Sequence, residues 1–155
     1  QVQRIGHDPG RYERPPTSQS FGHRDDTDPR WSSLYNESTF WGTTSDCAVQ
    51  LRDPERALEA ASKSLAILDP VEIQNHAVTM LSQGDALIQQ GEIAEACRII
   101  SEVVTRTATV YTSLRIRQRM TELVGALEPW QRSKPVRELN ELIATHSRSP
   151  GSTST

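Results

Sequence analysis

Histidine and cysteine side chains could bind a metal ion or act as a base or nucleophile, and the chain of 155 residues has four histidines and two cysteines. His76 would need a partner one helical turn further on, but that position is Met80. Cys47 and Cys97 fall on the apolar faces of expected helices, and their spacing pairs neither with a histidine. Two cysteines are also too few for a disulfide framework or a zinc site. We therefore expect His76 to be a core or solvent-edge residue and both thiols to be reduced and packed.

A second set of potential metal ligands lies near the start of the chain and consists of His7, Asp8, His23, Asp25 and Asp26. They belong to residues 1–27, where no apolar residue recurs at helical spacing, so no scaffold would fix a ligand geometry. The sequence contains no phosphate-binding glycine loop, zinc-protease motif, nucleophile elbow or calcium loop. We therefore expect a protein that is not an enzyme and that needs no cofactor or metal.

Charge is distributed unevenly along the chain, although the total is only -3. Residues 31–112 carry eleven acidic and five basic side chains, whereas residues 113–155 carry four acidic and seven basic ones. An acidic middle is a poor surface for a phosphate backbone. Weak nucleic-acid binding through the basic end stays open as an alternative, although an i, i+2 spacing spreads its first arginines around a helix. The basic side chains of this end are Arg115, Arg117, Arg119, Arg132, Lys134 and Arg137.

The chain divides into three regions by composition. Residues 1–27 contain prolines and glycines and predict an irregular leader or linker. Residues 147–155 are small and polar and predict a disordered tail. Residues 28–146 predict one helical domain. No apolar run is long enough for a transmembrane helix, the start has no secretory signal, and the first residue is not Met, so we expect a fragment or processed chain in the cytoplasm.

Helix boundaries in the middle region are indicated by capping residues. Asp-Pro pairs at 28–29, 53–54 and 69–70 each predict a helix start, because aspartate caps the helix and proline fits its first turn. Gly91 predicts a left-handed end to the third helix. Further helices are expected from about residues 93, 113 and 135. Because no segment alternates with a period of two, the sequence predicts an all-α fold.

Small and large residues recur along these helices in a pattern that resembles the tetratricopeptide repeat. Its anchors, Ala57, Ala96 and Val136, are 39 and 40 residues apart, which is longer than the usual period of about 34. Small residues let two helices of a pair approach, and larger ones fill the space between pairs. The resemblance implies antiparallel helix pairs stacked as a short right-handed solenoid of about three units. The residues assigned to this packing are Trp41, Ser45, Ala57, Ala61, Met80, Gly84, Ala96, Ile100, Met120 and Val136.

A further resemblance concerns the segments DPRWSSLYNESTFWG, LRDPERALEAASKSLAIL, QGEIAEACRIISEVV and LIATHSR. They look like the C-terminal repeat region of actinobacterial helix-turn-helix transcriptional regulators. In that family a DNA-binding domain precedes a tetratricopeptide-like sensor and dimerisation region. The resemblance implies a regulatory module that binds a protein, peptide or small effector and forms a homodimer, with DNA contacted only through an upstream domain that these residues lack. A free-standing adaptor scaffold is the alternative.

In such a superhelix the first helix of each pair lines the concave side. The residues expected there are Asp46, Val49, Gln50, Leu81, Asp85, Ile88, Gln89, Gln118, Thr121 and Glu122. Their mixture of apolar and polar groups suits an extended peptide or an amphipathic helix. The leader or a second subunit could fill the groove instead. Trp130, in a turn after Pro129, is expected to cap the last helix pair against the core.

Overall fold

The computed structural model describes residues 30–148, with side chains from Glu37 onward, and this part of the chain is helical without any strand. The all-α prediction is therefore confirmed, whereas the expected leader, the helix start at 28–29 and nearly all of the tail lie outside the described residues. None of the described helices is long and apolar enough to cross a membrane. The elements are α1 (Arg30–Gln50), α2 (Pro54–Ile67), α3 (Ile73–Gln89), α4 (Ile93–Thr107), α5 (Leu114–Ala126), the 3-10 helix η2 (Glu128–Trp130) and α6 (Lys134–Ser147).

Local capping explains where the helices begin. The Asp53 carboxylate accepts a hydrogen bond from the backbone N–H of Arg56 at 3.3 Å, which confirms the predicted start of α2. The prediction from Asp69 was wrong. Its carboxylate accepts from the N–H of Val71 at 3.0 Å and closes a turn, so α3 begins only at Ile73.

Two residues in the left-handed region end the first and third helices. Gly91 has φ 78°, and its N–H donates to the Ile88 carbonyl at 3.0 Å, as the predicted glycine cap requires. Arg52 has φ 61° and ends α1, with its N–H donating to the Val49 carbonyl at 3.1 Å. An arginine is an unusual residue for this conformation, so the sequence did not predict the tight turn that leads into α2.

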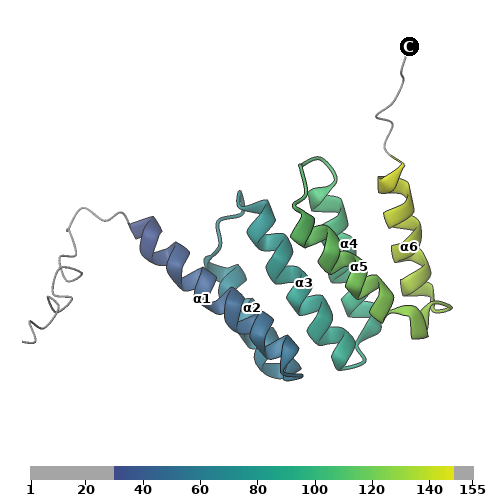
Figure 1. The fold of residues 1–155 in the computed structure, drawn as a ribbon, viewed down its shortest axis with the longest axis horizontal. Helices are drawn as coiled ribbons and strands as arrows, with labels where there is room; N and C mark the ends of the chain where they lie inside the picture. The colour runs from purple at the N-terminus through teal and green to yellow at the C-terminus, as the bar shows by residue number, and fades with distance from the viewer. Residues whose placement is uncertain (1–29, 149–155) are drawn as a thin grey trace, which may run out of the picture.

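The helices lie side by side, and the chain reverses direction from one to the next (Figure 1). α1 packs on α2, and α3 packs on α4, while α2 also contacts α3. The last two helices do not form a consecutive pair of this kind. Instead, α5 packs mainly on α3, and α6 packs mainly on α4. As a result α1, α3 and α5 are neighbours on one side of the array, and α1 and α2 lie at one end of it.

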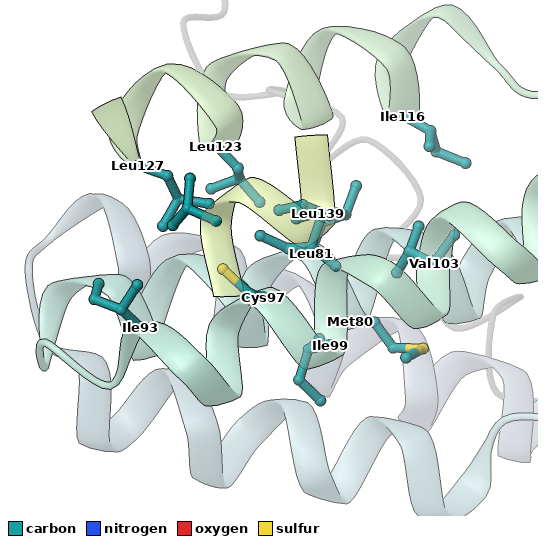
Figure 2. Close-up of a cluster of buried hydrophobic side chains, with 13 residues drawn as sticks. Met80, Leu81, Ile93, Cys97, Ile99, Val103, Ile116, Leu123, Leu127 and Leu139 are labelled. Atoms are coloured by element: carbon teal, nitrogen blue, oxygen red, sulfur yellow. The ribbon is translucent and has the colours of Figure 1, made fainter. Parts of the chain in front are cut away.

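The larger part of the core joins α3, α4, α5 and α6. Figure 2 shows Leu81 of α3, Leu123 of α5 and Leu139 of α6 pointing toward one another within this cluster. A second, smaller cluster joins α1, α2 and α3, and it consists of Ala48, Val49, Ala57 and Ala86, with Leu58 packed against it. The two ends of the array are therefore held by side chains of very different size.

Close helix approaches occur at several of the small residues. In the α1–α2 pair, the buried Ser45 hydroxyl donates to the Ala57 carbonyl at 2.9 Å. In the α3–α4 pair, a Cβ placed on Gly84 would lie 3.2 Å from Cγ1 of Ile100. The remaining packing residues are buried at Ala61, Met80, Ala96 and Val136 and half-buried at Trp41 and Met120.

Two side chains lie elsewhere than the sequence predicted. Cys47 is exposed, because neither α2 nor α3 covers its face of α1, whereas Cys97 is buried as expected. Trp130 is among the exposed large apolar residues, so it does not close the core as a cap. The core near the last helix pair is instead filled by Leu127, Val136 and Leu139.

Candidate functional site

Acidic and basic side chains meet on the face that α1, α3 and α5 share. The carboxylate of Asp46 on α1 accepts a hydrogen bond from the Ser82 hydroxyl of α3 at 2.5 Å. It also accepts from the Arg115 guanidinium of α5 at 2.9 Å. One side chain therefore connects all three helices.

Arg119 lies at the centre of the same cluster. Its guanidinium is 3.2 Å from the Asp85 carboxylate, 3.8 Å from that of Asp46 and 3.8 Å from that of Glu122. Gln89 extends the cluster, because its side-chain amide donates to Asp85 at 3.2 Å and to the Val49 carbonyl at 3.0 Å.

The charge of this cluster is nearly balanced. Asp46, Asp85 and Glu122 supply three carboxylates, and Arg115 and Arg119 supply two guanidinium groups, which leaves a net charge of -1. Asp46, Asp85 and Arg119 are only partly exposed, so their ion pairs are screened less than those of freely exposed groups. The cluster therefore orders the floor of the site, and exposed groups at its edge stay available to a ligand.

Three hollows follow this face and are joined through shared lining residues. The first has a volume of about 240 Å³ and the second about 210 Å³. Asp46, Val78 and Arg115 line both of them. The third hollow lies on α5 and shares Gln118 and Glu122 with the second. We call the three hollows together the groove.

The structure brings most of the predicted groove residues to this face. The second hollow is lined by Asp46, Gln50, Leu81, Gln118 and Glu122, and Thr121 lines the third. Asp85 and Gln89 belong to the polar cluster, and Ile88 packs against the main core.

The lining of the groove differs from the prediction at five positions, because none of the three hollows is lined by Val49, Asp85, Ile88 or Gln89, and Leu81 is fully buried beneath the second. Val49 is 3% exposed and packs in the small alanine-rich cluster, where α1 meets α2 and α3. Leu81 is 0% exposed, so it forms part of the floor of the second hollow and belongs to the main core. Helical spacing places a residue on a face, but the width of the buried stripe depends on which helices cover it.

Sequence reasoning missed the arginines that organise the site. The charge pattern assigns Arg115 and Arg119 only to a basic end, although they are one helical turn apart and share a face with Gln118 and Glu122. A second signal was available in the acidic residues, because Asp46 and Asp85 are 39 residues apart, which is the spacing of the first two repeat anchors. Matching the paired arginines to these carboxylates would have predicted the cluster.

The remaining chemically interesting residues lie away from the groove. Burial raises the pKa of the Cys97 thiol, so this buried cysteine is a poor nucleophile. His76 is half-buried, as expected for a residue at the solvent edge of α3. The part of the chain with described side chains holds no group of three or more residues that could bind a metal ion. His7 and His23 lie outside the described residues.

Comparison with known proteins gives no relative for this chain. No protein-family model matches it, and neither a curated protein nor a solved structure is similar enough to count as a match.

Proposed function

We propose that this chain is a non-enzymatic binding module whose groove takes an extended segment of a protein or peptide. In this proposal the helix pairs stack as a short right-handed solenoid in the tetratricopeptide manner, and α1, α3 and α5 line its concave side. The module acts as the sensor and dimerisation part of a transcription regulator. The regulatory role is supported by the sequence resemblance within residues 28–148, and peptide binding is supported by the groove.

The observation that carries peptide binding is the continuity of the three hollows along α1, α3 and α5, with Ser64 of α2 at the wall of the first. An extended peptide needs a long surface with polar groups for its backbone and separate contacts for its side chains. The exposed amide of Gln118 and the exposed charges of Arg115 and Glu122, at 71% and 67% exposure of their side chains, supply the polar groups. The exposed Leu114 supplies an apolar contact in the third hollow, and the buried Leu68 forms part of the wall of the first.

Selection from a displayed library of random peptides on the immobilised full chain tests this proposal. Fluorescence anisotropy with the best selected peptide should show binding that the double variant Arg115→Ala/Gln118→Ala weakens about tenfold or more, since two polar contacts of about 1 kcal/mol each are removed. Arg137→Ala, an exposed arginine on α6, is the matched control and should leave the affinity unchanged. Peptides that bind the double variant as tightly as the wild type would overturn the assignment of the groove.

The regulatory role has a separate test. The full chain is fused behind a DNA-binding domain that represses a reporter gene only as a dimer. Repression by the fusion supports the dimerisation part of the proposal, and absence of repression by a folded, expressed fusion contradicts it. A free-standing adaptor would keep the peptide affinity and fail this assay.

Nucleic-acid binding through the basic end is less well supported. Arg115 and Arg119 are directed toward Asp46 and Asp85, so their charge is largely balanced within the protein. Passage through a heparin column at low salt without retention is the expected result. Strong retention that falls with salt would favour the nucleic-acid alternative.

A further inference from the structure

One face of α1, together with the residue that follows the helix, carries apolar side chains that no other described helix covers. Phe40 is 61% exposed, Leu51 is 78% exposed, and the Cys47 thiol lies between them and is also exposed. Phe40 and Cys47 are seven residues apart and lie on one side of α1, and Leu51, the residue after the end of α1, continues this side because its N–H donates to the Cys47 carbonyl at 3.0 Å. We call Phe40, Cys47 and Leu51 the α1 stripe. α1 packs on α2 and α3 through its other sides and lies at the end of the array (Figure 1).

The α1 stripe differs from the exposed face of another helix in the same chain. On α4 the solvent side carries ion pairs, with Arg98 joined to Glu95 at 2.6 Å and Arg106 joined to Glu102 at 2.7 Å. Such charge pairs are typical of a helix face that stays in water. The α1 stripe instead presents apolar side chains without such charge pairs, which makes it a candidate contact surface.

We propose that the α1 stripe is the contact between two copies of this chain, with α1 packed antiparallel on α1 of the second copy. This proposal deepens the dimerisation part of the proposed function and rests on it. In a two-fold arrangement each patch meets its own copy. An antiparallel register that puts Phe40 opposite Leu51 of the second copy also puts Thr44 opposite Cys47, so that both aromatic–aliphatic contacts form at once.

Charge at the two ends of the stripe favours the antiparallel direction. Glu37 is exposed near the N-terminal end of the stripe, and Arg52 is exposed just beyond its C-terminal end. In the antiparallel register Glu37 lies near Arg52 of the second copy, and the two-fold axis forms this pair twice. A parallel arrangement would instead place like charges together at each end. The dipoles of the two helices are also opposed in the antiparallel arrangement, which is the favourable orientation.

A single helix-to-helix contact makes a small interface, below the roughly 1,200 Å² that marks a standard specific interface. The expected dimer is therefore weak, and its population rises with protein concentration. Light scattering after size exclusion should show a molar mass that increases from monomer toward dimer as the full chain is concentrated.

Cross-linking through Cys47 tests the position of the contact. A bismaleimide with a short spacer should convert the native full chain to a covalent dimer, because Cys47 is exposed and lies close to the two-fold axis, whereas Cys97 is buried. Cys47→Ser should abolish the product, and Cys97→Ser should preserve it. Leu51→Glu should abolish both the cross-link and the increase in molar mass, while Val71→Glu, at an apolar residue of similar exposure in the turn before α3, should change neither.

A charge exchange tests the direction of packing. Glu37→Arg should lower the yield of the cross-link several-fold, since it places a second positive charge near Arg52 of the second copy, and the double variant Glu37→Arg/Arg52→Glu should restore it. A monomer at every concentration would overturn the proposal, as would an unreactive Cys47 covered by another part of the chain. A dimer that survives Leu51→Glu would also overturn the α1 stripe as the contact, while leaving the dimerisation part of the proposed function intact. Peptide affinity is measured in a separate experiment, so it does not depend on any of these results.

Discussion

Replacing Gly84 with leucine perturbs a close approach of α3 to α4. A Cβ at this position would lie 3.2 Å from Cγ1 and 3.6 Å from Cδ1 of Ile100, and 3.8 Å from Cδ1 of Leu123. Ile100 and Leu123 are buried in the main core and cannot turn toward solvent. The three further carbons of a leucine side chain therefore have to displace packed atoms.

The magnitude follows from two opposed effects. Removing a glycine from a helix interior stabilises the folded state by up to about 1 kcal/mol. Overpacking a closely packed core costs about 1–3 kcal/mol and sometimes more. Because the first added atom is already in tight contact, we expect the upper part of that range and a net loss of about 2 kcal/mol for Gly84→Leu. Gly84→Ala adds only the Cβ, so its two effects should nearly cancel.

Urea unfolding followed by far-ultraviolet circular dichroism measures this loss as a lower midpoint at an unchanged slope. Gly42→Ala is the matched control on α1, because its Cβ would lie 3.4 Å from the Ser64 hydroxyl, an ordinary contact distance. This variant should be up to about 1 kcal/mol more stable than the wild type. A Gly84→Leu midpoint equal to that of the wild type would refute the close approach of α3 and α4.

Three further results are expected. Asp46→Asn weakens the hydrogen bonds and the ion pair that join α1 to α3 and α5. Because these groups are partly screened by solvent, the free energy of unfolding should fall by about 1 kcal/mol. An unchanged midpoint of urea unfolding would contradict this prediction. Iodoacetamide should label Cys47 rapidly and Cys97 only on unfolding, because burial shields the Cys97 thiol and raises its pKa. Mass spectrometry at low and high urea measures the labelling, and equal labelling of both cysteines in the native protein would contradict the prediction. Arg98, through its hydrogen bond and charge, lowers the pKa of Glu95, so this pair stabilises the folded state near neutral pH and the effect is lost as the pH falls through the lowered pKa. Unfolding of Glu95→Gln should accordingly depend less on pH in the acid range than unfolding of the wild type, and an identical pH dependence would show that the pair has no such effect.

Local signals predicted the helices well where one residue determines the geometry. Asp53 and Gly91 each act on their own backbone neighbours, so α2 begins and α3 ends close to the predicted positions. Asp69 shows the limit of such signals. The same Asp-Pro pair can start a helix or close a turn, and the hydrogen bond to the N–H of Val71 selects the turn.

The candidate site was only partly predictable, because its organisation depends on contacts between helices. Helical spacing brought Gln118 and Glu122 to the correct face of α5. It did not reveal that Arg115 would reach Asp46, a residue 69 positions earlier in the sequence. The exposure of Cys47 had the same cause, since the apolar pattern of α1 continues around the helix but α1 lies at the end of the array and has neighbours on only part of its surface.

The small side chains that hold α1 in place affect how the groove behaves over time. Alanine buries much less apolar surface than leucine or isoleucine, so the cluster that holds α1 contributes less apolar burial than the main core. Regions with few large buried contacts open first in the native state, which exposes their amides to hydrogen exchange. Because Asp46 belongs to α1, each such opening also dismantles the polar cluster. A bound peptide would oppose this opening through mass action. The protection of α1 amides would thus rise with occupancy, and α1 would be the segment of the molecule that senses whether the groove is filled.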